Sequence, residues 1–171
     1  MTPWLVSAAV VAVTSAGLSV VMQGEEEPAV AGSAAVGVSA AGEPLIRSVL
    51  CKGEQQPTLT VERATGPGNV GTVARFEPKH TMTDSSQFPV ESVSTDWTNT
   101  AGGFRVAEQP AGELVVGATD TSDGSHVNAV RVTANDWLGL KTGQWLVTDW
   151  TADGPVNKTL SARELTGFAC G

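Results

Sequence analysis

The two cysteines, Cys51 and Cys170, constrain the fold of this chain more than any other feature. They are the only cysteines in the sequence, and they stand near the two ends of residues 45–171. Disulfides persist in oxidising compartments and are rare in the cytosol. We therefore predict a Cys51–Cys170 disulfide, which by loop-closure entropy stabilises the fold by on the order of 4–5 kcal/mol. The alternative is two buried free thiols that act as small apolar side chains.

An apolar segment opens the chain. Residues 4–22 carry no charged side chain, and as a helix they reach about 28 Å, close to the apolar thickness of a bilayer, ~30 Å. We predict a hydrophobic helix over residues 1–23 that is either a retained membrane anchor or a cleaved export signal. Ala29-Val30-Ala31 resembles a cleavage site, whereas the absence of Lys and Arg before Arg47 is unusual for a signal peptide. The disulfide favours export of the C-terminal part.

A stretch rich in small residues follows. Residues 24–44 contain no aromatic residue, no Leu and no Ile. Such a segment buries little area to offset chain entropy, so we predict a flexible Ala/Gly/Pro-rich linker over 24–44. The alternative is an Ala-rich helix, but Pro28 and several glycines would interrupt it.

The remaining residues, 45–171, have the composition of a folded domain. They hold all ten Lys and Arg, all four Phe and four of the five Trp. Short runs of alternating apolar and polar residues recur between turn signals, at 45–50, 58–64, 70–77, 88–94, 103–109, 113–118, 126–134, 144–151 and 158–169. We predict an all-β domain of about 7–9 short antiparallel strands, arranged as a β-sandwich or a small barrel. The pattern of Ser161 to Glu164 fits a helix capping box, although a strand is also compatible with it.

Three tryptophans are the candidate binding residues. Along a regular strand over 144–151, Trp145 and Trp150 point to opposite faces, so one core cannot hold both indoles. Either a second layer covers the other face, or one indole is exposed to a partner such as a sugar ring or a protein. A bulge that buries both is the simpler alternative. Trp137, in a turn-rich connection, is the third candidate, whereas Trp97 is predicted to belong to the core.

Signals for chemistry are weak. His80, Asp84 and Ser85 are the residue types of a hydrolytic triad, but a polar turn explains them better because no nucleophile elbow is present. Neither His80 nor His126 has a partner at metal-ligand spacing, and the cysteines lack a C-x-x-C pattern. We therefore predict no metal and no cofactor. Asn157-Lys158-Thr159 fits a glycosylation sequon.

The net charge of the chain limits the classes of partner that it can bind. Eighteen acidic against ten basic residues give a net charge of −8, which argues against binding to nucleic acid. We expect an extracytoplasmic β-domain, secreted or membrane-anchored through residues 4–22, that is a surface binding or structural module for a protein or carbohydrate ligand. There are two alternatives. The first is a subunit of a pilus-like or virion surface assembly, a homo-oligomer packed through its N-terminal helix, and the second is a secreted hydrolase.

Overall fold

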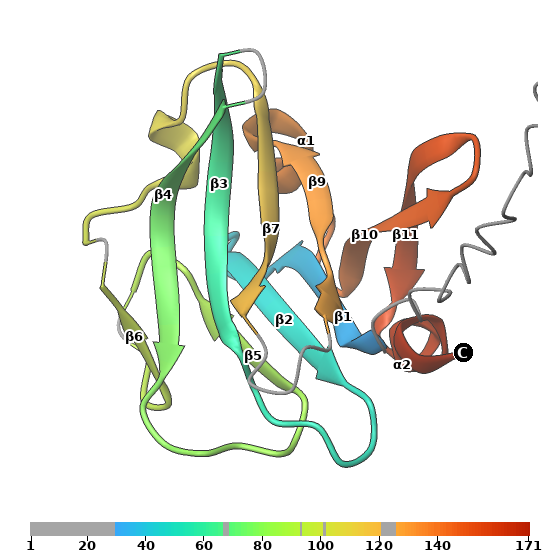
Figure 1. Cartoon of the computed structure of the whole chain (residues 1–171). Helices are drawn as coiled ribbons and strands as arrows, with labels where there is room; N and C mark the ends of the chain where they lie inside the picture. Colours follow the sequence, from blue (N-terminus) through green and yellow to red (C-terminus); the bar gives the residue numbers. More distant parts are fainter. Residues whose placement is uncertain (1–29, 67–68, 93, 101, 121–125) are drawn as a thin grey trace, which may run out of the picture.

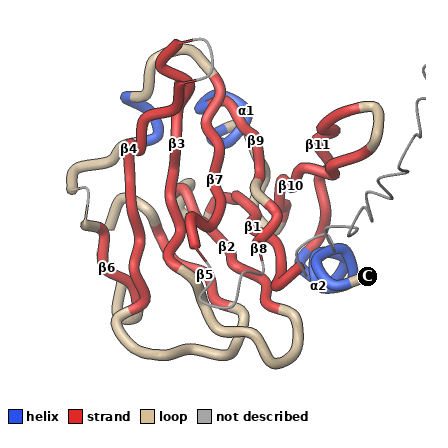
Figure 2. The backbone as a smooth tube through the Cα atoms, viewed as in Figure 1, coloured by secondary structure: helices blue, strands red, loops and turns tan. Residues whose placement is uncertain are grey.

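The computed structural model describes residues 30–66, 69–92, 94–100, 102–120 and 126–171. The predicted signal or anchor helix over residues 1–23 and the first residues of the predicted linker lie outside the described part. Within the described ranges, strands dominate and pair into two sheets (Figure 1, Figure 2). The prediction of an all-β, sandwich-like fold is therefore confirmed.

The first sheet has six strands in the described residues. They are β1 (Val30–Val38), β2 (Pro44–Leu50), β5 (Ser86–Pro89), β8 (His126–Asn128), β10 (Gln144–Thr151) and β11 (Gly154–Ser161). Their order is β11-β10-β1-β2-β5, and each of these neighbours is antiparallel. The short β8 pairs with β1 in parallel. Strand β1 is thus central, and β11 and β5 form the two edges.

Among the residues that the structure describes, the second sheet has five strands. They are β3 (Thr58–Gly66), β4 (Asn69–Pro78), β6 (Trp97–Asn99), β7 (Glu113–Asp120) and β9 (Val130–Thr133). Their order is β6-β4-β3-β7-β9, with antiparallel pairing throughout. Three short helices complete the described part: the 3-10 helix η1 (Val106–Glu108), α1 (Ala134–Leu138) and α2 (Ala162–Cys170). Figure 1 shows β10 and β11 extending from the body of the molecule beside α2.

The structure corrects the predicted linker. Within 24–44, the residues of β1 form the central strand of the first sheet, and Ala34 and Ala35 are fully buried. Small side chains are needed there because both faces of β1 are covered. A Cβ on Gly37 would lie 2.9 Å from the ring of Trp145. We predicted that these small residues bury too little area to belong to a core. In the structure, their small size is what allows β1 to pack closely on both faces.

The strand count also exceeds the prediction of 7–9, because eleven strands are present in the described residues. One addition is β1, from the predicted linker. Another comes from the run at 126–134, which divides at Ala129 into β8 of one sheet and β9 of the other. A chain that changes sheets within a few residues keeps its alternating pattern, so the sequence shows one run where the structure has two strands.

The helix α2 confirms the capping box. The main-chain N–H of Glu164 donates to the hydroxyl of Ser161 at 3.4 Å, and the main-chain N–H of Ser161 donates to the Glu164 carboxylate at 2.8 Å. This reciprocal pair satisfies two donors at the start of a helix. The run predicted at 158–169 is therefore divided between β11 and α2.

Two apolar cores result from this arrangement. The larger lies between the sheets and includes Ile46, Phe76 and Trp137. The smaller lies between the first sheet and α2, and its buried members are Ala35, Leu45, Val49, Trp145, Val147, Leu165 and Ala169. The first sheet is thus covered on one face by the second sheet and, around β1, β2 and β10, on the other face by α2.

The predicted disulfide is confirmed. Cys51 follows β2 directly, Cys170 is the last residue of α2, and their Cα atoms lie 5.5 Å apart. The bond joins the end of the second strand to the end of the C-terminal helix. It therefore holds α2 against the sheet that this helix covers.

Candidate functional site

Two of the three candidate tryptophans are buried. Trp137, on α1, is fully inaccessible, and its indole N–H donates to the carbonyl oxygen of Gly37 on β1 at 2.9 Å. Trp145, on β10, is 5% exposed and packs in the core beneath α2. The hypothesis that these two indoles are exposed to a partner is therefore wrong. Both indoles are covered by other residues of this chain.

Trp150 is the exposed member of the set. Half of its surface is open, at 50%, and its indole N–H donates to the carbonyl of Ala129 at 3.0 Å. The guanidinium of Arg131 lies 5.8 Å from the centre of its ring. Across the hairpin, Trp150 is paired in register with Pro155. The polar end of the indole is therefore anchored, while part of its apolar ring is available for contact.

The alternation predicted along β10 is observed. This strand pairs with β11 without a register shift from Gln144 to Thr151. Trp145 and Val147 belong to the core beneath α2, whereas Leu146 belongs to the core between the sheets. The side chain of Trp150 points to the same face of β10 as Leu146 but lies outside that core. Both predicted solutions thus occur: α2 supplies a second layer, and the other indole is half-exposed.

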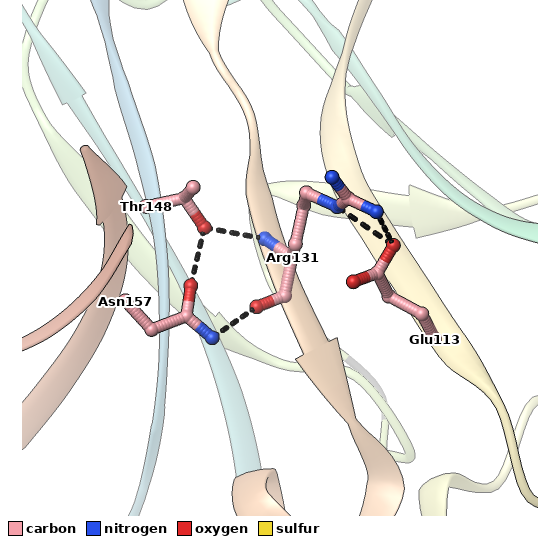
Figure 3. A network of polar contacts seen from close by, with 4 residues as sticks. All are labelled: Glu113, Arg131, Thr148 and Asn157. Carbon is pink, nitrogen blue, oxygen red and sulfur yellow. Dashed lines mark hydrogen bonds and ion pairs between the residues drawn. The ribbon is translucent and has the colours of Figure 1, made fainter. Parts of the chain in front are cut away.

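A polar network joins the two sheets beside Trp150 (Figure 3). On the edge strand β9, the main-chain N–H of Arg131 donates to the hydroxyl of Thr148 at 2.7 Å. That hydroxyl donates to the amide oxygen of Asn157 at 2.7 Å, and the amide nitrogen of Asn157 donates to the carbonyl of Arg131 at 2.9 Å. Side chains of the first sheet thereby satisfy main-chain groups at the edge of the second.

The charged part of this network is also paired. The guanidinium of Arg131 donates from Nε to the carboxylate of Glu113 at 2.7 Å and makes a second contact through Nη2. The amide of Asn157 uses both its oxygen and its nitrogen within the network, although the residue belongs to the sequon. We therefore assign Asn157 a structural role.

The polar network lies at one lateral edge of the sandwich, where β9 meets β10. An aromatic cleft lies at the other lateral edge, where β5 faces β6. The rings of Phe88 and Trp97 stack with centroids 4.4 Å apart, and Phe76 lies 5.2 Å from Phe88. Together with Val90 and Phe104 they line a cleft of about 360 Å³. Trp97 is 3% exposed, which confirms its predicted place in the core. No local sequence pattern indicates this cleft, because its aromatic residues come from separate strands and loops that only the tertiary fold brings together.

The triad-like residues do not form a catalytic arrangement. His80 is exposed, and its Nε2 lies 3.9 Å from the carboxylate of Asp96 rather than near Asp84. The hydroxyl of Ser85 accepts from the main-chain N–H of Leu50 at 3.0 Å. Among the described residues no hydrogen bond joins the side chains of His80, Asp84 and Ser85. The observation that suggested a hydrolase therefore finds no support in the geometry.

The helices of the described part include none that is both long and apolar enough to cross a bilayer. Comparison with protein-family models, with curated proteins and with solved structures finds no significant match to this chain. Its function therefore has to be argued from its own residues.

Proposed function

We propose that this chain is a disulfide-stabilised β-sandwich module that works outside the reducing cytosol and binds a protein or carbohydrate at its surface. The observation that carries the proposal is the Cys51–Cys170 bond, because such bonds persist in oxidising compartments. Residues 4–22 would deliver the module to that compartment, as an anchor or as a signal. The net charge of −8 fits a solvated, outward-facing domain.

Trp150 is the residue that supports a binding role. An indole with one polar end and an open ring is typical of contacts with partners, and tryptophan is enriched among the residues that dominate interface energies. Its anchored N–H and the nearby Arg131 hold the ring in one orientation. Because the ring is already ordered, binding a partner costs less side-chain conformational entropy.

The compartment is tested on the full chain in the cells that produce it. Thiols are blocked with an alkylating reagent as the cells are opened, and mass spectrometry then reports Cys51 and Cys170 before and after reduction. We expect both to be modified only after reduction, and the chain to separate with the extracytoplasmic fraction. Modification of both thiols without reductant would overturn the proposal.

The binding role is tested by Trp150→Ala against the matched surface change Val156→Ala on the neighbouring strand. Both side chains are about half-exposed, at 50% and 49%. On an array of purified glycans and on the intact surface of the producing cells, we expect Trp150→Ala to lose retention and Val156→Ala to keep it. Equal retention of both variants and the parent would remove Trp150 from the proposal.

A further inference from the structure

Strand β11 forms an open edge of the first sheet. It is last in the strand order, pairs with β10 on one side, and is exposed at every residue from 155 to 159. The helix α2 follows β11 in the chain but packs over β1, β2 and β10. Within the described part of the chain, the outer side of β11 is therefore uncovered. An open strand edge offers main-chain donors and acceptors to another chain.

The hairpin turn determines which main-chain groups of β11 point outward. Thr151 and Gly154 flank a two-residue turn and pair in register, and residues that flank such a turn exchange hydrogen bonds. Main-chain groups alternate in direction along a strand, so those of every second residue from 155 onward point away from β10. Pro155, the first of these residues, has no N–H, as expected at an edge position that faces outward. The N–H of Ser161, the last of them, donates to the Glu164 carboxylate instead of to β10.

The outward N–H groups of Asn157 and Thr159 lie between these two positions. Neither donates to another group among the described residues, and the carbonyl groups of both residues also point outward. A two-fold axis at Lys158 would pair Asn157 of one copy of the chain with Thr159 of a second copy. Antiparallel residues paired in this way exchange two hydrogen bonds, so the two symmetric pairs would make four. This arrangement uses both N–H groups that remain on the edge.

The side chains of this edge are complementary under the same axis. Val156 is 49% exposed and lies on the same face of the sheet as Leu160, the face that α2 covers around β10. The axis would place Val156 of one copy opposite Leu160 of the other, so that both bury apolar surface. Lys158 would meet its own equivalent, but its Nζ lies 2.5 Å from the carboxylate of Asp149. Its charge is therefore compensated within each copy, unlike that of the unpaired lysines that protect strand edges.

We propose that two copies of this chain associate through β11, in an antiparallel pairing centred on Lys158 that joins their first sheets into one. An axis at Asn157 would instead place Val156 opposite Lys158 and would bury less apolar surface. A single pair of strands is a small interface, so we expect weak association. Trp150 lies on the other face of the sheet from Val156. The inference therefore goes beyond the proposed binding role and does not require that Trp150 bind anything.

Hydrogen exchange measured by NMR tests the pairing on the oxidised, ¹⁵N-labelled full chain in a mild detergent. The protein concentration is raised from roughly 50 µM to roughly 1 mM, a range suited to a weak interface. We expect exchange at the N–H groups of Asn157 and Thr159 to slow by about fivefold or more, because they become paired. The N–H groups of Val156 and Lys158 already pair with β10 and should exchange equally slowly at both concentrations. Exchange at Asn157 and Thr159 that does not depend on concentration would overturn the proposal.

Two substitutions with matched controls assign the contact. Thr159→Pro removes an outward donor that β10 does not use, whereas Thr159→Ala keeps it. Val156→Asp places a charge opposite Leu160, and Val70→Asp makes the same change at an exposed position on the second sheet.

Sedimentation equilibrium measures the association of these variants and of the parent chain. Symmetry makes each substitution act twice, so we expect Thr159→Pro and Val156→Asp to weaken association by at least about tenfold. Thr159→Ala and Val70→Asp should associate as the parent does. Association that persists in both Thr159→Pro and Val156→Asp would mean that another part of the chain, such as residues 4–22, makes the contact, and the inference would be wrong. The exchange measurement on the parent chain decides the question even if a variant does not fold.

Discussion

The two lateral edges of the sandwich bring the sheets together by different chemistry. At the β9–β10 edge, main-chain groups of Arg131 and the side chains of Thr148 and Asn157 satisfy one another in a closed set of hydrogen bonds (Figure 3). At the β5–β6 edge, stacked aromatic rings make the contact and leave the indole N–H of Trp97 unpaired beside a cleft. The polar groups of the first edge are therefore hydrogen-bonded within the structure, whereas the second edge is held by apolar packing that leaves one buried donor unpaired.

The largest expected effect comes from removing the disulfide, which holds α2 against the first sheet and belongs to neither edge. We expect Cys51→Ser with Cys170→Ser to lower the free energy of unfolding by about 4–5 kcal/mol. Urea titration of the oxidised parent and the double variant measures the loss. Reductant should destabilise the parent and leave the double variant unchanged. An equal unfolding midpoint for parent and double variant would mean that the bond does not stabilise the fold.

A second change breaks the polar edge. Thr148 is 1% exposed, and its hydroxyl joins Arg131 to Asn157. Thr148→Val keeps the shape but leaves a main-chain donor unpaired, so we expect a loss of about 1–3 kcal/mol in unfolding free energy. Thr159→Val, at an exposed position on β11, is the control and should change stability by less than about 0.5 kcal/mol. Equal effects of the two substitutions would show that the network does not stabilise this edge.

A matched pair of substitutions sharpens the contrast between paired and unpaired indoles. Trp137→Phe leaves the carbonyl of Gly37 without its buried donor, so we expect a cost of about 1–3 kcal/mol beyond the lost packing. Trp97→Phe removes a donor that is already unpaired and should lack this extra cost. Thermal and urea unfolding of both variants measure the difference. A larger loss for Trp97→Phe would contradict the assignment of an unsatisfied donor.

The smallest expected effect concerns pH and lies outside both edges, at the start of α2. Hydrogen bonds from the main-chain N–H and the hydroxyl of Ser161 lower the pKa of the Glu164 carboxyl below its usual 4.5. A lowered folded-state pKa contributes stability above the unfolded pKa, and this contribution is lost as pH falls through the folded pKa. Glu164→Gln should therefore be slightly less stable than the parent at pH 7.

The same prediction sets how the two proteins compare in acid. The difference in Tm between the parent and Glu164→Gln should shrink as the pH falls below 4.5 and through the lowered pKa of Glu164, because the carboxylate of the parent is then protonated. Glu108→Gln, at an exposed position outside the capping box, is the control for the general loss of a negative charge. A difference in Tm that stays constant from pH 7 to pH 3 would contradict the role of the Glu164 charge.

Several features could be predicted because they depend on local or covalent chemistry. The disulfide was expected from the number and position of the cysteines, and the start of α2 from the pattern of Ser161 and Glu164. The alternation along β10 likewise predicted that Trp145 and Trp150 face opposite ways. Each inference needs only neighbouring residues or the single available pair of cysteines.

The place of β1 and the aromatic cleft could not be predicted in this way. Small residues suit an unpacked tether and a strand covered on both faces equally well, so composition does not separate the two. The rings of the cleft are joined only by strand register, which no local pattern contains. Whether a tryptophan is buried or exposed depends on which layer covers its face.

By itself, the sequence of this protein determined its all-β class, its covalent closure and the periodicity of its strands, since these follow from side-chain alternation and from thiol chemistry. Tertiary structure alone decided that β1 is central, that Trp150 rather than Trp137 or Trp145 is exposed, and that the N–H of Trp97 lacks a partner. The physical reason is that burial and hydrogen-bond satisfaction are properties of neighbours in space. The chain brings those neighbours together from strands far apart in its sequence.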